Sequence, residues 1–468
     1  MKFAVIISTR TFFPGALALD ARQIVLRRLQ ALGHEAVLVG ENETKYGAVC
    51  TYEDAKKCAA LFRAHRDEIA GVLIVLPNFG DEVGISSALK LAELNVPVLL
   101  MASDDETDKM DLSHRRDAFC GKLSAGANLT QNGILFTPTK LHTLPLDSDL
   151  FDEEIGRFAA ICRVVNGMRR ARIGAIGARP DAFRTVRYSE KLLQRSGITT
   201  CVLDFSDLLG RMENMDLQSD AFRRNLADVK AWGRLGAEAT EEKLIRNAKL
   251  LTATESWLQE NEIDAFAFQC WDSLEYHFGC AACLMMSILS ERGIPAACEM
   301  DVTGAVTMLA MRLASGTAPG YLDWNNSFTA DRDKCVCLHC SNFPKSFLGV
   351  EPEIGSLDVL GTTIDRELCF GACKGQVAPG PFTYLKVTTD DGSGKIRYYT
   401  GRGEFLAEKV NTPGGVAACR VPGLQSLMQY LLRNGFEHHV CMGRGSEAEI
   451  LTEALSGYLG WEGYFHEA

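Results

Sequence analysis

Two acidic residues and a pair of histidines are the side chains of this chain best placed for chemistry at one site. Glu299 ends the apolar run IPAACE and Asp323 ends the run GYLD, and both runs are predicted to be strands. A single helix between them would make a crossover that brings both strand ends to the same edge of a parallel sheet. His438 and His439 follow in the run FEHHV. Because side chains of a strand alternate between its two faces, we expect only one of these imidazoles to face the site.

Two carboxylates and one imidazole form an oxygen-rich set of metal ligands. Such a set suits Mn²⁺ or another divalent cation better than the closed cysteine sites that hold structural zinc. A divalent cation that chelates two adjacent sugar oxygens would stabilise the enediolate formed when a carbonyl moves between C1 and C2, while the carboxylates carry the proton. The alternative is that the acids cap helices or lie on the surface and that the histidines are structural.

Arginines in two loops at expected strand ends could bind an anionic group. The loop ARPDAFRTVR carries Arg179, Arg184 and Arg187, and the loop STRTFFPG carries Arg10. A guanidinium group recognises a planar anion through two parallel hydrogen bonds. The ligand could therefore carry a sulfonate, carboxylate or phosphate. The alternative is that these arginines are solvated or form surface salt bridges.

The elements that must position these residues alternate between strand and helix through most of the chain. Continuous apolar runs such as GVLIVLP, separated by amphipathic helices, are typical of parallel sheets with helices on both faces. From about residue 330, short β-type runs and the hairpin signal DDGSGK replace this pattern. We predict an α/β protein with two doubly wound, Rossmann-like domains, 1–165 and 166–316, and a β-barrel-like C-terminal domain with a helical tail, 317–468.

Composition excludes several classes of partner. The 468 residues include 49 Lys and Arg against 60 Asp and Glu, for a net charge of −11. This balance argues against nucleic acid and anionic membranes as partners. No GxGxxG follows a predicted strand, so the dinucleotide fingerprint is missing. No export signal is apparent, and we expect a cytoplasmic protein whose 16 cysteines are thiols.

The segment 270–316 resembles the L-fucose isomerase and L-arabinose isomerase superfamily. It contains a CW turn, then a cysteine-containing helix, then a CE-x-D-x-x-G-A-x-T-M block. Four further motifs follow in the order found in that superfamily: LDWNN (322–326), LHCSN (338–342), KG-x-x-A-P-G-P-x-T (374–383) and HHV (438–440). The resemblance is strongest over roughly 265–442. It implies an aldose–ketose isomerase that requires a divalent metal, usually Mn²⁺, and forms a trimer or hexamer.

The resemblance also implies roles for individual residues. Glu299, Asp323 and His439 would bind the metal, and the two acids would exchange the roles of catalytic acid and base. His339 corresponds to an additional ligand of the arabinose isomerase branch that the fucose isomerase branch does not use, so its role stays open. The predicted substrate-binding residues are Arg10, Asn78, Arg179, Arg184, Arg187, Trp271, Asn325, His339 and Lys374.

We therefore predict a metal-dependent aldose–ketose isomerase that acts on a monosaccharide through an enediol intermediate. An isomerase of an anionic sugar such as sulfoquinovose is one alternative, and a sugar-binding protein without catalytic activity is another. A redox protein built on Cys335, Cys337 and Cys340 is a third. We expect a homo-oligomer, with a hexamer favoured, whose sites are completed across subunits, so that the loop PNFGDE with Asn78 would act in a neighbouring subunit.

Overall fold

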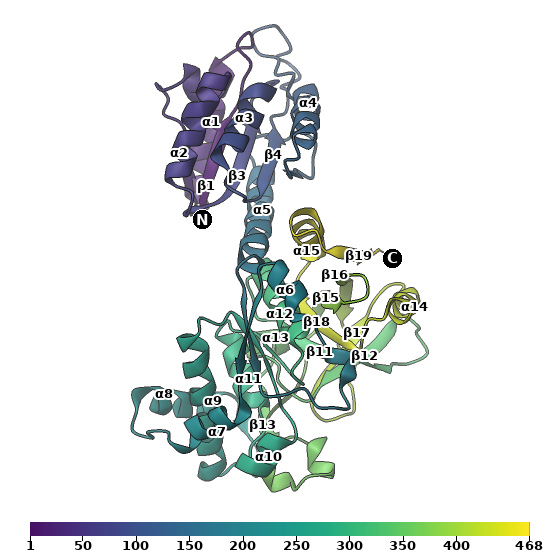
Figure 1. Cartoon of the computed structure of the whole chain (residues 1–468). Coiled ribbons are helices and arrows are strands. Elements are labelled where there is room, and N and C mark those ends of the chain that lie inside the picture. Colours follow the sequence, from purple (N-terminus) through teal and green to yellow (C-terminus); the bar gives the residue numbers. More distant parts are fainter. Residues whose placement is uncertain (468) are drawn as a thin grey trace. The chain divides into compact units, whose positions relative to one another are not determined.

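The computed structural model describes residues 1–467, which form two compact units (Figure 1). The first unit comprises Met1–Asn166 and Glu453–Leu459. The second unit comprises Gly167–Thr452 and the chain from Gly460 onward. In the described part of the chain, no helix is both long enough and apolar enough to cross a bilayer.

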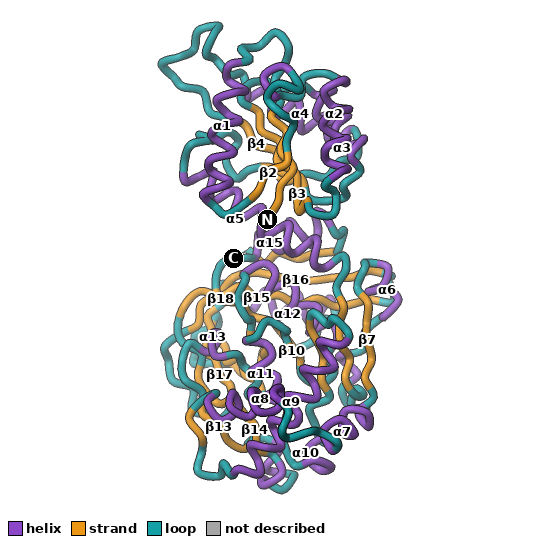
Figure 2. Tube along the Cα trace, turned by 90° about the vertical axis from the view of Figure 1, so that its left-hand side faces the viewer, coloured by secondary structure: helices purple, strands orange, loops and turns teal. Residues whose placement is uncertain are grey.

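The first unit is built on a parallel sheet of five strands. In spatial order the strands are β2 (Glu35–Val37), β1 (Lys2–Ile7), β3 (Ile69–Leu76), β4 (Val98–Ala102) and β5 (Thr137–Pro138). The other elements of this unit are α1 (Ala16–Ala31), η1 (Lys45–Gly47), α2 (Tyr52–Ala64), α3 (Glu82–Ala92), α4 (Ala118–Gln131), most of α5 (Asp149–Met168) and η5 (Glu453–Tyr458). Alternate residues of β1 enter two apolar cores, one beneath α1 and α5 and one beneath α2, α3 and α4. In Figure 2 these helices lie on opposite sides of the strands.

The second unit contains a smaller parallel sheet of four strands. Their order is β10 (Ala296–Ala297), β9 (Ala265–Phe268), β6 (Arg172–Ile176) and β7 (Thr199–Leu203). The elements around it are η2 (Arg184–Val186), α6 (Glu190–Arg195), α7 (Phe205–Glu213), α8 (Asp220–Ala231), α9 (Glu241–Glu260), α10 (Ser273–Phe278), α11 (Cys283–Glu291) and α12 (Val302–Ser315). The parallel sheets that the apolar runs predict are thus confirmed in both units.

The second unit also contains a mixed sheet of ten strands. Their order is β19 (Glu462–His466), β16 (Lys395–Phe405), β15 (Gly380–Asp390), β18 (His439–Arg444), β11 (Gly320–Ser327), β12 (Lys334–His339), β17 (Gly415–Arg420), β14 (Phe370–Gln376), β13 (Glu353–Ser356) and β8 (Arg234–Leu235). The remaining elements are α13 (Lys345–Leu348), η3 (Leu360–Thr362), η4 (Arg366–Leu368), α14 (Leu424–Asn434) and α15 (Ala448–Thr452). The β15–β16 hairpin closes at Asp390 and Lys395, as DDGSGK predicts. β16 also pairs with β17. A closed barrel stays a prediction. A domain boundary near residue 316 also stays a prediction.

One expectation about the sheets is wrong. The strand that carries Asp323, β11, was expected to continue the parallel sheet after the helix α12. Instead β11 belongs to the mixed sheet and runs antiparallel to both β12 and β18. The chain leaves the parallel sheet after β10, so a strand–helix–strand crossover does not bring Glu299 and Asp323 together. Their proximity depends on packing between the two sheets of the second unit.

Candidate active site

The residues expected to bind a metal come together in the second unit. Glu299 lies in the turn between β10 and α12, Asp323 is in β11, His339 ends β12 and His439 begins β18. Glu299 Oε2 is 3.4 Å from Nε2 of both His339 and His439. Nε2 of His439 is 3.6 Å from Asp323 Oδ1. Glu299 and both imidazoles are buried, and Asp323 is partly buried.

Two overlapping groups of donor atoms among the described residues could hold a divalent cation: Glu299 with His339 and His439, and Asp323 with His438 and His439. Ligands held about 2.1 Å from a common ion lie roughly 3 to 3.5 Å apart. Glu299 Oε2 and Asp323 Oδ1 are buried oxygens that accept no hydrogen bond from the described residues. A buried carboxylate oxygen without a partner is costly, and a bound cation would satisfy it. Carboxylate and imidazole together suit Mn²⁺ or a similar ion.

The electrostatic environment favours an ionised carboxylate at Glu299. Burial alone would raise its pKa, but the imidazoles of His339 and His439 and the indole N–H of Trp271 together lower the pKa to about 2. The Trp271 Nε1 donates to Glu299 Oε1 at 3.3 Å. Burial would lower the pKa of His439, but Glu437, Asp301 and Glu299 raise it to about 9. Without a metal, His439 therefore carries a proton on both nitrogens at neutral pH.

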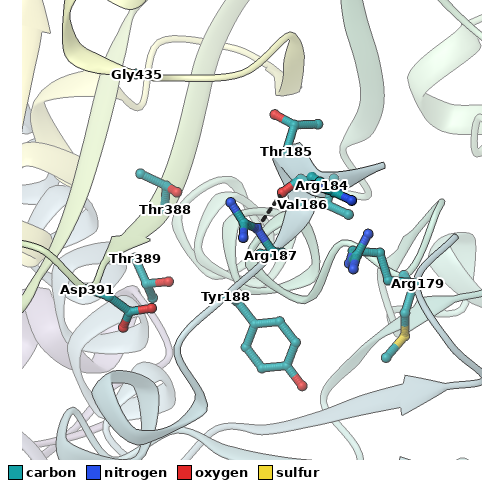
Figure 3. A pocket seen from close by; sticks show the side chains of 11 residues that line it. Arg179, Arg184, Thr185, Val186, Arg187, Tyr188, Thr388, Thr389, Asp391 and Gly435 are labelled. Atoms are coloured by element: carbon teal, nitrogen blue, oxygen red, sulfur yellow. Dashed lines mark hydrogen bonds between the residues drawn. The ribbon is translucent and has the colours of Figure 1, made fainter. Parts of the chain in front are cut away.

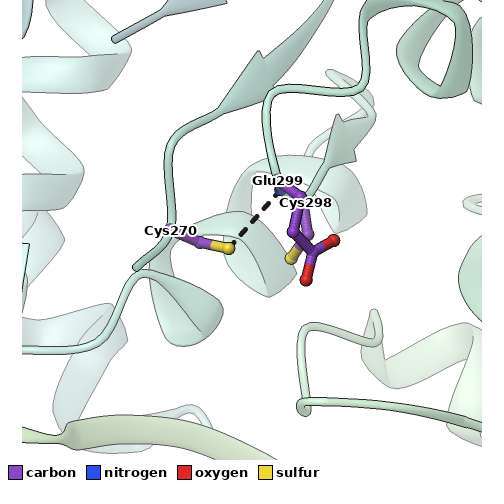
Figure 4. A group of neighbouring side chains, drawn as sticks. All are labelled: Cys270, Cys298 and Glu299. Atoms are coloured by element: carbon purple, nitrogen blue, oxygen red, sulfur yellow. Dashed lines mark hydrogen bonds between the residues drawn. The ribbon is translucent and has the colours of Figure 1, made fainter. Parts of the chain in front are cut away.

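The backbone that carries Glu299 adopts a conformation that non-glycine residues rarely adopt. Glu299 has φ of 53° and Met300 has φ of 60°. Cys270 and Cys298 lie next to this turn, and the Glu299 N–H donates to Cys270 Sγ at 3.4 Å (Figure 4). Two consecutive left-handed residues store backbone strain, which is typical of functional sites. The turn thereby aims the Glu299 carboxylate at the imidazoles.

A buried ionic network next to His439 was not predicted from the sequence. Asp301, which is 0% exposed, caps α12 by accepting from the Gly304 N–H at 2.7 Å. Its second oxygen accepts hydrogen bonds from Tyr321 Oη and Lys386 Nζ and lies 3.1 Å from His439 Nδ1. Asp301 lies in the CE-x-D block, which could have drawn attention to it, whereas no motif marks Lys386. The network holds the imidazole ring of His439 at Nδ1.

The expectation that only one histidine of the pair faces the site needs correction. His439 begins β18, whereas His438 precedes this strand, so strict alternation of side chains does not apply to the pair. Nε2 of the half-exposed His438 is 3.9 Å from Asp323 Oδ1. The ring of Phe183 contacts both imidazoles, with centroids 5.7 Å apart in each case. Phe183 therefore covers the imidazoles on one side.

The three predicted loop arginines of the second unit line one cavity, shown in Figure 3. The cavity has a volume of about 630 Å³ and also includes Met300, the residue after Glu299. Arg184 is 4.0 Å from Asp181 with both side chains exposed. Arg179 and Arg187 donate to backbone carbonyls, and neither forms a salt bridge with a described carboxylate. The cavity thus offers guanidinium groups that an anion could use.

The structure places the other predicted substrate-binding residues elsewhere. Asn325 lies at a bulge of β11 and lines a different cavity, of about 210 Å³, while Lys374 pairs with Asp358 at 2.5 Å. Arg10 and Asn78 belong to the first unit, where Arg10 pairs with Glu82 and Asn78 is bonded to Thr9. Substrate-binding roles for these four residues stay predictions.

Together, the parallel sheets, the mixed sheet and the buried carboxylate–imidazole cluster define an α/β protein with a candidate site for a metal ion. The chain belongs to the fucose isomerase-like superfamily of sugar isomerases: residues 4–169 match the family "Fucose/sulfoquinovose isomerase, N-terminal domain", and residues 337–466 match "L-fucose isomerase, C-terminal domain". The resemblance seen in the motifs is confirmed. The protein is an enzyme that interconverts aldose and ketose sugars, and the alternative of a sugar-binding protein without catalysis is not supported.

Several relatives carry a more specific name. The chain is 25% identical over 311 residues to the sulfoquinovose isomerases of Priestia aryabhattai and Priestia megaterium, covering 66% of this chain and 67% of each relative. It is 26% identical to the sulfoquinovose isomerase of Alkalicoccus urumqiensis over 324 residues, covering 66% of this chain and 68% of the relative. Among solved structures, an ABC transporter solute binding protein from Agrobacterium vitis with bound allitol is 11% identical to this chain. The alignment covers 64% of this chain and 74% of that protein. Its TM-score of 0.16 is too low to inform on fold or function.

Proposed function

We propose that the protein is a metal-dependent isomerase that interconverts an aldose and a ketose through an enediol intermediate. The observation that supports this proposal is that Glu299 Oε2 and Asp323 Oδ1, two oxygens without a hydrogen-bond partner among the described residues, lie 3.4 Å and 3.6 Å from Nε2 of His439. Glu299, Asp323 and His439 would hold Mn²⁺ or another divalent cation. When bound, such a cation supplies positive charge that stabilises two adjacent, negatively charged sugar oxygens.

The residues of the chain provide the proton-transfer groups. Glu299 is ionised at neutral pH and can accept the proton from the sugar carbon next to the carbonyl. Asp323 is the second carboxylate of the cluster and takes the opposite role when the reaction reverses. Trp271 orients Glu299 through its N–H, and the ring of Phe183 contacts the imidazoles of His438 and His439. These roles follow from position and charge in the cluster.

We further propose that the substrate is an anionic sugar of the sulfoquinovose type. The relatives named sulfoquinovose isomerase support this choice over a neutral deoxysugar. The cavity that adjoins Glu299 through Met300 supports it independently, because Arg179, Arg184 and Arg187 line its wall. Two or three guanidinium groups would hold a sulfonate by charge-assisted hydrogen bonds. A neutral monosaccharide remains the alternative substrate.

The proposal is tested with protein freed of metal by EDTA and then supplied with single divalent cations. Sulfoquinovose is compared with quinovose, which is the same sugar without the sulfonate. We expect no turnover without metal, turnover with Mn²⁺, and a higher kcat/KM for the sulfonated sugar. Full activity after complete metal removal would contradict metal dependence. Equal kcat/KM values for the two sugars would contradict the anionic substrate but leave the isomerase reaction standing.

Assembly forms a separate part of the proposal. We propose a homo-oligomer, with a hexamer favoured, in which the loop that carries Asn78 completes the site of a neighbouring subunit. The support is membership of the superfamily together with the polar loop at the end of β3. Light scattering of the active protein tests this directly, and a fully active monomer would contradict it.

A further inference from the structure

Three thiols of the mixed sheet lie close together, outside the metal site proposed above. Cys335 and Cys337 are in β12, and Cys419 is in β17. The Sγ atoms of Cys335 and Cys337 are 3.9 Å apart, and Cys419 is the residue directly opposite Cys335. All three side chains belong to one buried apolar core, whereas the nearby Cys340 packs against a different core. The structure thus groups Cys335 and Cys337 with a cysteine that is distant in the sequence.

Cys335 is the thiol of this group that a small molecule can reach. It is 7% exposed, whereas Cys337 and Cys419 are fully buried. Cys335 lines the cavity of about 210 Å³ described above, and Leu424 and Met428 of α14 form part of the same wall. A cavity of this size has room for water and for molecules of similar size, such as hydrogen peroxide. Access to the group is therefore through Cys335.

The neighbouring thiols favour the anionic form of Cys335. Hydrogen bonds with Cys337 and Cys419 lower the pKa of Cys335, while burial raises the pKa of these two partners. The first proton to leave the group therefore comes from Cys335. The thiolate is the form of cysteine that peroxides oxidise. The most accessible thiol of the group is thus also the most acidic one.

Strand geometry selects Cys419 as the partner of an oxidised Cys335. The two residues are directly opposed on antiparallel strands, so their side chains lie on the same face. Cα atoms of such a pair are about 4.5–5.5 Å apart, within the range of roughly 4.4–6.8 Å that disulfides span. Residues two apart in one strand, such as Cys335 and Cys337, are about 6.6 Å apart, at the upper limit of that range. A disulfide between Cys335 and Cys419 therefore requires the smaller change of the backbone.

We propose that Cys335 is an oxidation site for hydroperoxides and that it then forms a disulfide with Cys419. In the first step the Cys335 thiolate attacks one oxygen of hydrogen peroxide, the O–O bond breaks, and hydroxide leaves a sulfenic acid on the protein. In the second step the sulfur of Cys419 attacks the sulfenic sulfur, the S–O bond breaks, and the oxygen leaves as water with the thiol proton. The proton that Cys335 lost converts the hydroxide to water. Two thiols are thereby oxidised, and one peroxide is reduced to two molecules of water.

Peptide mapping of the wild-type protein tests the proposal directly. The protein is treated with hydrogen peroxide, its remaining thiols are blocked with N-ethylmaleimide, and it is digested with trypsin. Cys419 lies in the peptide 410–420, which has no other cysteine, and Cys335 lies in the peptide 335–345. We expect these peptides to be joined through Cys335 and to separate on reduction. A link from Cys419 to Cys337 or Cys340, a link within 335–345, or no link would overturn the proposal.

The exposed Cys120 shows whether Cys335 is more reactive than an ordinary surface thiol. The same digests are prepared over a series of peroxide concentrations. We expect half of Cys335 to be oxidised at a concentration about tenfold lower than half of Cys120, because thiolate character outweighs exposure. Oxidation of Cys120 before Cys335 would show that Cys335 is a buried core cysteine without special reactivity.

Serine variants assign the roles of the two cysteines. Cys419→Ser removes the second thiol, so the sulfenic acid on Cys335 should persist and its labelling by dimedone should rise about fivefold or more over the wild type. Cys373→Ser, which changes a buried cysteine of β14, is the matched control and should form the link as the wild type does. Thermal unfolding checks that each variant is folded. Unchanged dimedone labelling in folded Cys419→Ser would contradict the role of Cys419, and the wild-type map decides if this variant does not fold.

Discussion

Asp323 and His439 lie directly opposite each other on the neighbouring antiparallel strands β11 and β18. Their backbone register therefore sets the 3.6 Å approach of Asp323 Oδ1 to Nε2 of His439. Directly paired residues of a sheet have the closest side chains that two strands can offer. Two of the three proposed ligands are thus positioned by strand pairing, and only Glu299 is contributed from the parallel sheet.

Loss of a proposed ligand should remove the metal and the activity together. Glu299→Gln and Asp323→Asn keep the size of the side chain but remove its charge, so we expect Mn²⁺ affinity and kcat/KM each to fall by about a hundredfold or more. Metal content after gel filtration and kinetics with added Mn²⁺ measure the two effects. Asp331→Asn, which changes an exposed acid paired with Arg420, is the control and should behave like the wild type. Full metal content in both ligand variants would contradict the site.

The arginine-lined cavity should determine the preference for an anionic sugar. Arg179→Gln removes a guanidinium group that has no described carboxylate partner, so kcat/KM for sulfoquinovose should fall about tenfold or more. The same variant should leave kcat/KM for quinovose nearly unchanged, since that sugar has no sulfonate. Arg195→Gln, on the helix α6, is the matched control. An equal loss with both sugars would show that Arg179 does not recognise the anion.

Metal affinity should rise with pH in the neutral range. The pKa of His439 is raised to about 9, so below that pH its second proton must leave before Nε2 can bind a cation. The Mn²⁺ association constant should therefore increase by up to about tenfold per pH unit between pH 7 and 9 and level off above. Glu299, with its pKa lowered to about 2, adds no pH dependence in this range.

Calorimetric titration with Mn²⁺ at several pH values measures this slope, and buffers of different ionisation enthalpy count the released protons. His438→Gln should retain the slope, because the half-exposed His438 is not one of the proposed ligands. An association constant that does not change from pH 7 to 8.5 would contradict the protonated state assigned to His439.

Turnover in D₂O should place deuterium on the product. In the enediol route a carboxylate carries the proton, which can exchange with solvent, and C1 receives it when a ketose forms from an aldose. In a metal-assisted hydride shift, the hydrogen passes from C2 to C1 without meeting solvent. Mass spectrometry of the ketose after many turnovers measures the label. Complete transfer of deuterium from C2-labelled substrate in H₂O, without exchange, would refute the enediol route.

Much of the local structure could be predicted from the sequence. Continuous apolar runs such as that of β3 indicate buried parallel strands, because both faces of such a strand are covered by helices. Glu299 could be placed at a strand end for the same reason, since the apolar run stops there. DDGSGK predicts its hairpin because glycine and aspartate favour tight turns.

The assembly of the site could not be predicted in the same way. Asp323 lies opposite His439 because β11 pairs with β18, which is more than 100 residues further along the chain. A local sequence pattern does not specify which distant strands pair. A strand–helix–strand crossover does not link Glu299 and Asp323, because β11 joins the mixed sheet. Lys386 looks like an ordinary strand lysine in the sequence. Only the folded structure shows that Lys386 is fully buried and pairs with both Asp301 and Glu437.

The two left-handed residues Glu299 and Met300 face different parts of the second unit. Glu299 faces the imidazoles, and Met300 lines the cavity that contains Arg179, Arg184 and Arg187. A substitution that reshapes this turn would disturb the reaction centre and the choice of sugar at once. Arg179 and Arg187 line the cavity, whereas Phe183 of the same loop contacts the imidazoles of His438 and His439. New substrate ranges, whether reached by natural divergence or by engineering, are therefore expected to arise by changes at these arginines, while Phe183 and the turn stay fixed.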